Sequence, residues 1–310
     1  MDREAVQASL RGPIASVRTP FARDGSIDYA GLRRLIDFDI AAGARALLLT
    51  WGDSLFALLT DAEIAALTRA VASAAGGRAT VIACTGRWAT PKAVEFAAFC
   101  RECGADILQV FPPFWYPGAC APAALVAHHA ALAAHVPLAA NNAELMRQGG
   151  EAAGLELAQS LLAQVEGVWA MKADVTGEFD RRVTSLVRDR WAVFAGGQKS
   201  FHLELWPYGC AGYLSTFITF RPAVAHAYWR EIASGNVRAA AAIVERIDRP
   251  FFARIAGLAG GFDAALHGIA EICGLAGRWR RPPFASLGDA ELEELEQFLR
   301  ELPDPAAVAR

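Results

Sequence analysis

Residues 80–111, TVIACTGRWATPKAVEFAAFCRECGADILQVF, contain one complete unit of the predicted fold. Two apolar runs, Thr80–Cys84 and Ile107–Phe111, lack strict alternation of apolar and polar residues, which is typical of parallel strands buried on both faces. Between them, Pro91–Cys103 has helical periodicity, with Thr90 as its predicted N-cap and a glycine directly after its last residue. The stretch therefore predicts a strand–helix–strand unit with parallel strands.

The same alternation recurs along the chain, so that eight apolar runs are separated by amphipathic segments. Eight strand–helix pairs predict a closed parallel barrel, for which about 250 residues are typical. An open, doubly wound sheet is the alternative, but no glycine-rich nucleotide turn follows the first predicted strand. The predicted strands are Ile14–Val17, Ala46–Leu49, Thr80–Cys84, Ile107–Phe111, Leu138–Asn141, Val168–Lys172, Trp191–Ala195 and Gly212–Thr216. The predicted helices include Tyr29–Ala42, Asp61–Ala75, Pro91–Cys103, Pro122–His135 and Gly154–Val165, with Asp28 and Thr60 as further N-caps.

The part of the chain that follows the eighth predicted strand has only helical patterns. We therefore predict an α/β fold, a (β/α)₈ TIM barrel over residues 1–223, with a C-terminal helical extension over residues 224–310 that packs on the barrel. The helices predicted in the extension are Val224–Ser234, Val237–Leu258, Asp263–Cys273 and Asp289–Glu301.

Composition limits the classes of function. Of 310 residues, 54% are apolar and 20% are charged, which is sufficient for a large core and argues against disorder. The net charge is -3 without basic clusters, so we expect neither nucleic-acid nor membrane binding. The N-terminal segment MDREAVQASLRGP lacks the apolar run of a secretory signal, and we expect a soluble cytoplasmic protein. Cys100 and Cys103 form a C-x-x-C within a helical pattern; without a second ligand pair, reduced thiols are expected rather than a zinc or redox site.

Lys172 is the most informative residue, because it ends the apolar run Val168–Met171. In barrels of this kind, reactive groups lie at the carboxyl ends of the strands. Low-dielectric walls disfavour a charged ammonium and leave a neutral amine, which can condense with a carbonyl. The alternative is a solvated lysine just beyond a strand.

Several segments together carry a family resemblance. Thr50–Ser54 resembles a G-T-T-G-E-S segment, Phe111–Trp115 resembles T-P-Y-Y, and Gly167–Lys172 resembles a G-I-K strand that bears a Schiff-base lysine. Gly209–Ser215 resembles a G-G-x-G-x-I-S run, and residues 12–50 resemble the first strand, T-P-F turn and first helix of the same family. In their order and spacing, these segments resemble the dihydrodipicolinate synthase and N-acetylneuraminate lyase family over nearly the whole chain.

The resemblance implies a lyase of the class I aldolase type that binds pyruvate or another 2-oxo acid as an imine on Lys172. It implies that the substrate carboxylate binds to the backbone N–H groups and the hydroxyl of the turn Thr50–Gly52. Carbon–carbon cleavage, condensation or dehydration would follow through an enamine. It also implies a homo-oligomer, a dimer or a tetramer. No cofactor or metal is expected, since no nucleotide motif and no cluster of His, Asp and Glu falls across the strand ends.

The chain departs from the family where a tyrosine usually relays protons. Its fifth predicted strand ends in Asn141 and Asn142, so that either Ala140 or Asn141 would face Lys172. A second family tyrosine aligns with Trp115, and the adjacent Tyr116 would be its substitute. Without the relay tyrosine, genuine dihydrodipicolinate synthase activity is not expected. The predicted catalytic residues are Lys172, Asn141 and Tyr116, and the predicted substrate-binding residues are Thr50, Trp51, Gly52, Asp53, Trp115, Asn142, Arg147, Gly196 and Ser215.

Other polar residues keep two interpretations each. Arg147 would bind a second substrate carboxylate or remain solvated, and Asp174 would orient Lys172 or act as a base. Lys199 and His202 follow the seventh predicted strand and would reach the barrel mouth as an anion ligand and a proton shuttle. The adjacent histidines at positions 128 and 129 are expected to be structural.

Two further functions compete with the lyase. One is a catalytically silent barrel that binds keto acids or sugar acids as a sensor or assembly partner. The other is an enzyme whose chemistry does not depend on Lys172.

Overall fold

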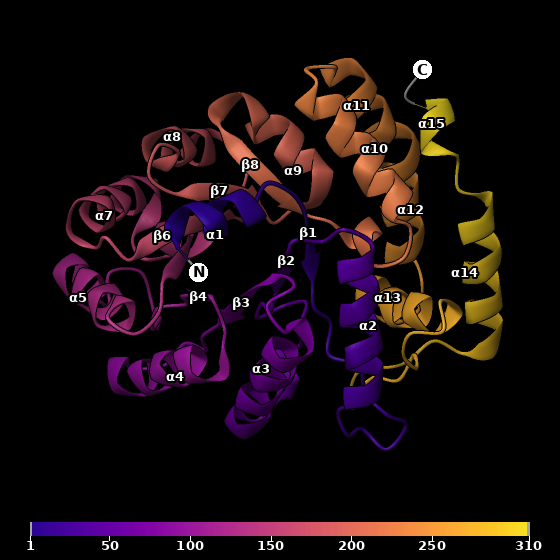
Figure 1. Cartoon of the computed structure of the whole chain (residues 1–310), viewed down its shortest axis with the longest axis horizontal. Helices are drawn as coiled ribbons and strands as arrows, with labels where there is room; N and C mark the ends of the chain where they lie inside the picture. The colour runs from indigo at the N-terminus through magenta and orange to yellow at the C-terminus, as the bar shows by residue number, and fades with distance from the viewer. Residues whose placement is uncertain (1, 309–310) are drawn as a thin grey trace.

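The computed structural model describes residues 2–308, and its centre is a closed barrel of eight parallel strands paired in chain order. Helices surround the strands (Figure 1). The predicted (β/α)₈ barrel followed by C-terminal helices is thus confirmed. The strands are β1 (Gly12–Ser16), β2 (Ala46–Leu48), β3 (Thr80–Cys84), β4 (Ile107–Gln109), β5 (Leu138–Asn141), β6 (Val168–Ala173), β7 (Ala192–Ala195) and β8 (Cys210–Leu214).

The helices that follow the strands include the five that were predicted, although the one predicted over Gly154–Val165 begins four residues earlier. They are α2 (Tyr29–Ala41), α3 (Asp61–Ala75), α4 (Thr90–Cys103), α5 (Pro122–Ala133), α6 (Asn142–Arg147), α7 (Gly150–Gln164), α8 (Glu178–Val187) and α9 (Gln198–Leu205). Short 3₁₀ segments η1 (Phe56–Leu58), η2 (Trp206–Tyr208) and η3 (Thr216–Thr219) complete the loops.

The sequence did not predict the short helix α1 (Arg3–Ser9), which lies in front of β6 and β7 in Figure 1. Its buried Val6 packs with Leu10 against the apolar side chains inside the barrel, and its Gln7 amide donates to the Trp169 carbonyl oxygen at 3.1 Å. Helix α1 therefore covers one end of the barrel, and functional side chains must be sought at the other end.

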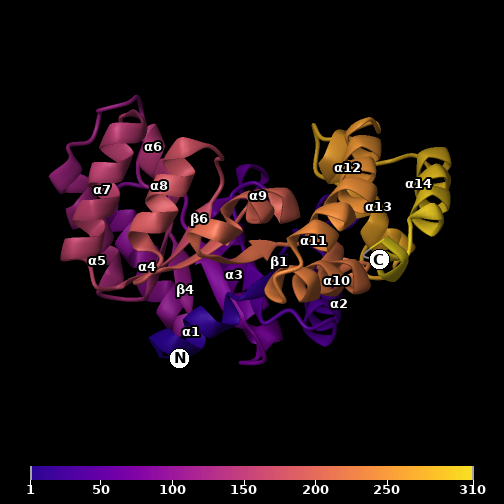
Figure 2. The ribbon, with the colours of Figure 1, turned by 90° about the horizontal axis from the view of Figure 1, so that it is seen from above.

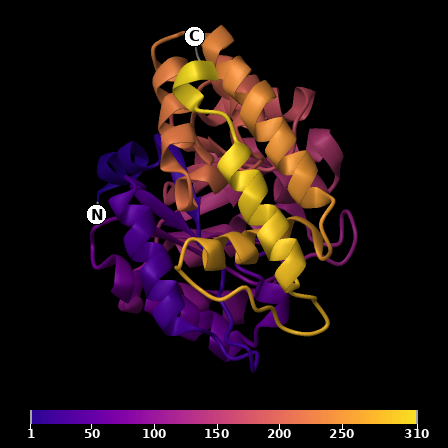
Figure 3. The same cartoon turned by 90° about the vertical axis from the view of Figure 1, so that its right-hand side faces the viewer.

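The C-terminal part is helical throughout: α10 (Pro222–Ala233), α11 (Val237–Ile243), the π-helical turn η4 (Val244–Asp248), α12 (Arg249–Ala256), α13 (Gly261–Ile272), α14 (Asp289–Glu301) and α15 (Pro305–Val308). Figure 2 shows α12, α13 and α14 on the side of the strands opposite to α5, α7 and α8. Helix α14 lies on the outside of this group and contacts α13 (Figure 3).

One long helix was predicted where the structure has α11, η4 and α12. Pro250 in α12 has no backbone N–H, and its ring crowds the carbonyl of the preceding turn. The π-helical turn just before it accommodates that loss by widening the backbone. The wider turn also sets the direction of Asp248, a buried residue that reaches back to the barrel.

The core has two parts. Inside the barrel lie the side chains that alternate inward from the strands, such as Ile14, Leu48, Ile82 and Phe194, together with residues from α1. A larger shell between strands and helices contains the outward neighbours, such as Leu47 and Val81. Because parallel strands are buried on both faces, the apolar runs read as continuous.

Two of the three predicted N-caps are confirmed. The Asp28 side chain accepts from the N–H of Gly31, and Thr60 forms a capping box with Glu63. Thr90 was wrong as a cap, because it is the first residue of α4 and Ala89 occupies the cap position without a side-chain bond. The Thr90 hydroxyl instead pairs with a histidine of α5, so tertiary contact replaces local capping.

A bulge between β5 and β6 sets the register at the barrel mouth. Leu138 pairs with Val168, but the next residue, Ala139, pairs with Ala170, so Trp169 is the extra residue on β6. As a result, Asn141 lies opposite Lys172. The sequence left open whether Ala140 or Asn141 faces Lys172. The register shows that it is Asn141, since Ala140 pairs with Met171.

The cysteines at 100 and 103 are free thiols on α4, and the first of them is buried. Within residues 2–308, no helix combines the length and the apolar character that crossing a membrane requires.

Candidate active site

A cavity of about 400 Å³ opens at the carboxyl ends of β2 to β7. Parallel barrel strands bring residues that are distant in sequence to this rim. The cavity is lined by Thr50, Trp51, Gly52, Asp53, Arg87, Phe111, Asn141, Ala143, Glu144, Arg147, Lys172, Asp174 and Gly196. The structure therefore brings together eight of the predicted site residues, namely Lys172, Asn141, Thr50, Trp51, Gly52, Asp53, Arg147 and Gly196.

Lys172 is the penultimate residue of β6, and its side chain is only 8% exposed. Its Nζ atom lies 2.6 Å from Asp174 Oδ1 and 2.8 Å from Asp174 Oδ2. An ammonium between two carboxylate oxygens is stabilised by Coulomb attraction in this weakly solvated setting. Asp174, which the sequence offered as a residue that would orient Lys172, is thus in direct contact with it.

Asp174 is held from several sides. The Asn141 Nδ2 group donates to Asp174 Oδ2 at 2.6 Å, and the Asp174 backbone N–H donates to Asn142 Oδ1 at 2.6 Å. Both contacts come from the end of β5, so the bulge that aligns Asn141 with Lys172 also orients this carboxylate.

Gly196 leaves the space in which the ion pair lies. A Cβ atom at this position would stand 1.8 Å from Asp174 Oδ1 and 2.9 Å from Lys172 Cε. The first distance is far below any contact that two such atoms adopt, so a larger residue would displace the carboxylate. The site therefore requires a residue without a side chain at position 196. The Gly196 backbone N–H donates to the Ala173 carbonyl oxygen at 2.7 Å.

The turn after β2 presents donors to the cavity. The Thr50 N–H donates to Ser54 Oγ at 3.0 Å and is therefore occupied. Among residues 2–308, no acceptor bonds the backbone N–H groups of Gly52 and Asp53 or pairs with the Thr50 hydroxyl. A negatively charged group would find three donors here, of which only the Asp53 N–H lies beyond the predicted turn Thr50–Gly52.

Asp53 lies on the same turn, but its negative charge is compensated. Its carboxylate lies 3.4 Å from the Arg18 guanidinium and accepts from the Ser16 hydroxyl at 2.6 Å. Burial would raise the pKa of Asp53, but Arg18 and Ser16 outweigh burial, so the pKa lies below its ordinary value. Arg18 also bonds Asp263 of α13 at 2.9 Å, which links the barrel mouth to the C-terminal helices.

Two arginines meet on one carboxylate at the rim. Arg87 binds both oxygens of the buried Glu144, and Arg147 Nε lies 3.4 Å from Glu144 Oε1. Arg147 also stacks over Phe114, with its guanidinium carbon 5.4 Å from the ring centroid. One carboxylate neutralises only one of the two guanidinium groups, so this side of the cavity carries a net positive charge.

Asn142 is buried beneath the site and does not line the cavity. Its Nδ2 group donates to Asp180 Oδ1 of α8 at 2.5 Å, while its oxygen accepts from Asp174. Burial raises the pKa of Asp180 to about 7, against the opposing bond from Asn142. Asn142 therefore supports Asp174 from behind and is not placed to touch a substrate.

Besides Asn142, three predicted site residues lie outside the cavity of the single chain. Trp115 is 84% exposed and Tyr116 is 58% exposed, and neither lines the cavity. Ser215 is fully buried at the end of β8, where its N–H donates to the Ile14 carbonyl at 2.9 Å.

Lys199 and His202 turn away from the mouth, contrary to one interpretation of the sequence. The Lys199 ammonium is completely buried and lies 2.9 Å from Asp248 Oδ1, with the Phe217 ring centroid at 4.2 Å. His202 Nδ1 lies 2.8 Å from the Tyr228 hydroxyl, and burial lowers the pKa of His202 to about 3. Both residues point from α9 into the interface with the C-terminal helices.

His128 and His129 are both buried on α5 and remote from the cavity, as expected for structural residues. His128 Nδ1 lies 2.9 Å from the Thr90 hydroxyl, and His129 Nδ1 lies 2.7 Å from the Leu125 carbonyl oxygen.

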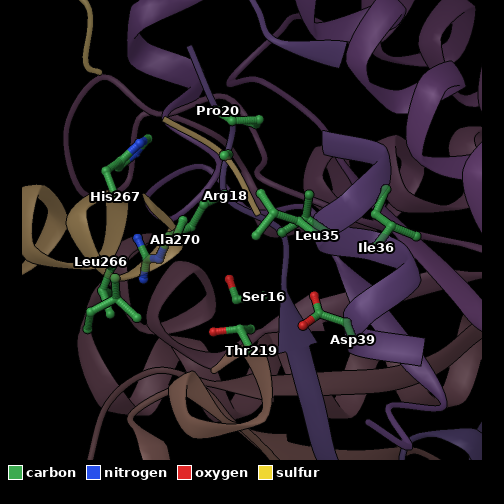
Figure 4. Close-up of a pocket in the computed structure, with 13 residues that line it drawn as sticks. Ser16, Arg18, Pro20, Leu35, Ile36, Asp39, Thr219, Leu266, His267 and Ala270 are labelled. Atoms are coloured by element: carbon green, nitrogen blue, oxygen red, sulfur yellow. The ribbon is translucent and has the colours of Figure 1, made fainter. Parts of the chain in front are cut away.

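A second, narrower cavity of about 40 Å³ lies between β1, α2 and α13 (Figure 4). Asp39 and His267 line it, and Figure 4 shows the Asp39 carboxylate pointing toward Ser16 and Thr219. Burial raises the pKa of Asp39 well above its ordinary value and lowers the pKa of His267 to about 4. Lys172 does not line this cavity, so the candidate active site is the larger one at the strand ends.

The sequence analysis missed several residues of that site, among them Arg87 and Glu144. Each lies within three residues of a predicted strand end, which is the signal that could have found them. Asp174 had been considered as a residue that orients Lys172 or acts as a base, and the structure shows its direct contact with Lys172.

The comparisons with known proteins agree with the fold. A model of the Dihydrodipicolinate synthetase family matches residues 9–302. The 4-hydroxy-tetrahydrodipicolinate synthase of Methylococcus capsulatus is 28% identical over 77% of this chain and 81% of its own. A probable 5-dehydro-4-deoxyglucarate dehydratase of Streptomyces coelicolor is 29% identical over 77% of this chain and 76% of its own.

Solved structures share the fold at lower identity. N-acetylneuraminate lyase from Mycoplasma synoviae superimposes with a TM-score of 0.82 at 18% identity, covering 95% of this chain and 98% of that chain. YagE of Escherichia coli K12, a prophage protein solved in complex with pyruvate, has a TM-score of 0.79 at 21% identity, covering 94% of this chain and 98% of that chain. The chain therefore belongs to the dihydrodipicolinate synthetase family, whose members are synthases, lyases and dehydratases of the class I pyruvate aldolase type.

Proposed function

We propose that this protein is a lyase that forms a Schiff base between Lys172 and pyruvate or another 2-oxo acid. The observation that carries the proposal is the position of the Lys172 amine, which lies at the carboxyl end of β6 and lines a cavity of about 400 Å³. A lysine amine in such a place can attack a ketone, and the resulting iminium withdraws electrons from the neighbouring carbon.

The turn after β2 supports a carboxylate subsite. The N–H groups of Gly52 and Asp53 and the Thr50 hydroxyl supply donors at the cavity wall, where a substrate carboxylate needs hydrogen-bond partners. Because Arg18 compensates the charge of Asp53, the turn does not repel a substrate anion. Trp51 adds an aromatic wall beside these donors.

The opposite rim supports a second anionic group on the substrate. Arg87 and Arg147 share Glu144, so one guanidinium has no matching charge. We therefore propose a 2-oxo acid whose far end carries a carboxylate or another acidic group. Loss of a carbon–carbon or carbon–oxygen bond adjacent to the iminium would then leave an enamine on Lys172.

Borohydride trapping tests the proposal. Incubation with pyruvate and borohydride should add the mass of one reduced pyruvyl group to the intact protein, and peptide mapping should place it on Lys172. The variant Lys172→Ala should gain no mass, whereas Lys92→Ala, which changes an exposed lysine on α4, should be trapped like the wild type. An unmodified wild-type chain across a panel of 2-oxo acids would sink the proposal.

One observation favours a silent, ligand-binding barrel as the second candidate. Lys172 forms an ion pair with Asp174, and an ammonium must lose a proton before its nitrogen can attack a carbonyl. A silent barrel predicts calorimetric binding of keto acids or sugar acids without any trapped adduct. Activity that persists in Lys172→Ala would instead indicate chemistry independent of this lysine.

We also propose that the protein works in the cytoplasm as a homo-oligomer, either a dimer or a tetramer. The exposure of two neighbouring aromatic residues, Trp115 and Tyr116, supports a contact between copies at this loop. Light scattering of the wild type and of Trp115→Ser would test it, and a monomeric wild type would contradict it.

A further inference from the structure

We propose that the Asp174 carboxylate is the catalytic proton acceptor and donor for imine formation on Lys172; this inference rests on the proposed function. Both of its oxygens lie within 2.8 Å of Lys172 Nζ, the atom that must attack the carbonyl. A group in direct contact with the reacting nitrogen meets the first requirement of a general base, which is reach.

The surroundings of Asp174 fix its direction. Asn141 donates to one oxygen, Asn142 accepts from the backbone N–H, and the missing side chain of Gly196 leaves the space that the carboxylate fills. Asn141 thus acts as a positioning residue, because an amide does not exchange protons near neutral pH. This reassigns Asn141 from the predicted catalytic role.

Access to the cavity differs between the two partners. The Lys172 side chain is 8% exposed, whereas the Asp174 side chain is 26% exposed. The carboxylate can therefore touch both the buried amine and a substrate oxygen or water in the cavity. A carboxylate that carries protons between Lys172 Nζ and the hydroxyl group that leaves must reach both of them.

The other acids of the cavity are engaged elsewhere. Asp53 is held by Arg18 and Ser16, and Glu144 is held by Arg87 and Arg147. No hydrogen bond joins either carboxylate to Lys172 Nζ. The described residues that line the cavity include no histidine, tyrosine or cysteine. Asp174 is therefore the one lining group that combines contact with Nζ and the ability to hold a proton.

The proton steps balance on this single carboxylate. Asp174 first takes a proton from the Lys172 ammonium, and the neutral amine attacks the ketone carbon, so that a C–N bond forms and the carbonyl π electrons move to oxygen. Protonated Asp174 gives its proton to that oxygen and then takes one from the nitrogen. It finally protonates the hydroxyl, which leaves as water while the C=N bond forms, and Asp174 is again a carboxylate. The net change converts ammonium and ketone into iminium and water.

The rate of adduct formation tests the inference. Wild type, Asp174→Asn and Asp174→Ala would be mixed with pyruvate, quenched with borohydride at set times and analysed by intact mass. Asp174→Asn keeps the size and polarity of the side chain but cannot carry the proton. We therefore expect the rate of adduct formation to fall by a factor of about 100 or more. Glu178→Gln removes an exposed charge from the start of α8 as the matched control, and should react at the wild-type rate.

Chemical rescue separates proton transfer from a structural role. In Asp174→Ala, added formate can enter the vacated space beside Gly196 and supply a carboxylate, so the adduct rate should rise with formate concentration. A merely structural Asp174 would show no such rise, and absence of rescue in a variant with wild-type circular dichroism would overturn the inference. Asp174→Asn that forms the adduct at or above the wild-type rate would overturn it as well. A wild type without any adduct would refute the proposed function itself.

Discussion

At the residue scale, the proposed reactivity of Lys172 depends on the carboxylate that it contacts as well as on its burial. Burial alone disfavours an ammonium, but a carboxylate at 2.6 Å stabilises one. The same contact supplies the acceptor for the proton that the amine must lose. On this proposal, Lys172 and Asp174 form an ion pair before substrate binds, and the same contact passes the proton during the reaction.

Gly196 provides the prediction at this scale. Gly196→Ala would place a Cβ atom 1.8 Å from Asp174 Oδ1, so the carboxylate must leave Lys172. We expect the rate of pyruvate adduct formation to fall about tenfold or more, consistent with loss of a positioned general base. Time-resolved trapping measures it. Gly257→Ala, where the nearest atom would lie at 3.5 Å, is the control and should leave the rate unchanged.

At the scale of elements, short irregular segments position the site. The bulge at Trp169 aligns β5 with β6, and the end of β5 becomes the cap of α6, since Asn141 Oδ1 accepts from the Glu144 N–H at 3.3 Å. One side chain thus caps a helix and orients a carboxylate. Helix α6 in turn carries Glu144 and Arg147 to the rim.

The buried pair Lys199–Asp248 joins α9 to η4 and provides the prediction at this scale. Burial lowers the pKa of Lys199, while Asp248 opposes that shift by attraction. Asp248→Ala would leave an uncompensated buried ammonium, and we expect the free energy of unfolding to fall by about 3–5 kcal/mol. The double variant Lys199→Met with Asp248→Leu should recover most of this loss. Urea denaturation measures both, and a double variant as unstable as the single one would contradict the electrostatic explanation.

At the scale of the whole molecule, the barrel and the C-terminal helices share both charge and apolar contacts. Arg18 of the mouth bonds Asp263 of α13, and Phe217 packs on Phe251 with ring centroids 4.8 Å apart. We propose on this basis that residues 1–223 and 224–310 fold together as one unit. The active site would then depend on helices that contribute no side chain to its cavity.

Stability against pH is a property of the whole chain. Burial lowers the pKa of His129, His202 and His267 to about 4, 3 and 4, whereas an unfolded histidine titrates near 6.5. Between pH 6.5 and about 4 the unfolded chain binds more of these protons, so the free energy of unfolding falls as pH falls, by about 3 kcal/mol per histidine. Two carboxyl groups act in the opposite direction, because burial raises the pKa of Asp180 to about 7 and the pKa of Asp39 well above its ordinary value.

We therefore expect each buried histidine to make the melting temperature more sensitive to pH between pH 7 and pH 4, against the opposing effect of these carboxyl groups. His267→Phe preserves the stacking on Phe21 and removes one titrating group, so the loss of unfolding free energy over this range should be about 3 kcal/mol smaller than in the wild type. His226→Phe changes an exposed ring and should keep the full dependence. Equal slopes for the wild type and His267→Phe would refute the assignment.

The sequence by itself determined the barrel, its helical C-terminal part and the lysine at the mouth. These features follow from local patterns, because apolar runs and amphipathic helices alternate along the chain and the short motifs keep a fixed order. In a parallel barrel, the carboxyl end of every strand then lies on the same rim. Strands β3 and β5 and helix α3 begin and end at the predicted residues. A lysine that ends an apolar run therefore had to lie at the mouth.

Only the tertiary structure decided which groups meet there. Asn141 rather than Ala140 faces Lys172 because of a bulge that depends on pairing between two strands. Asp174 turns toward Lys172, and Lys199 turns away to Asp248, because each follows the nearest opposite charge in space. The Lys199–Asp248 pair joins residues 49 positions apart and the bulge depends on pairing between strands, so no local pattern encodes either of them, whereas the sequence had already offered Asp174 as a residue that would orient Lys172.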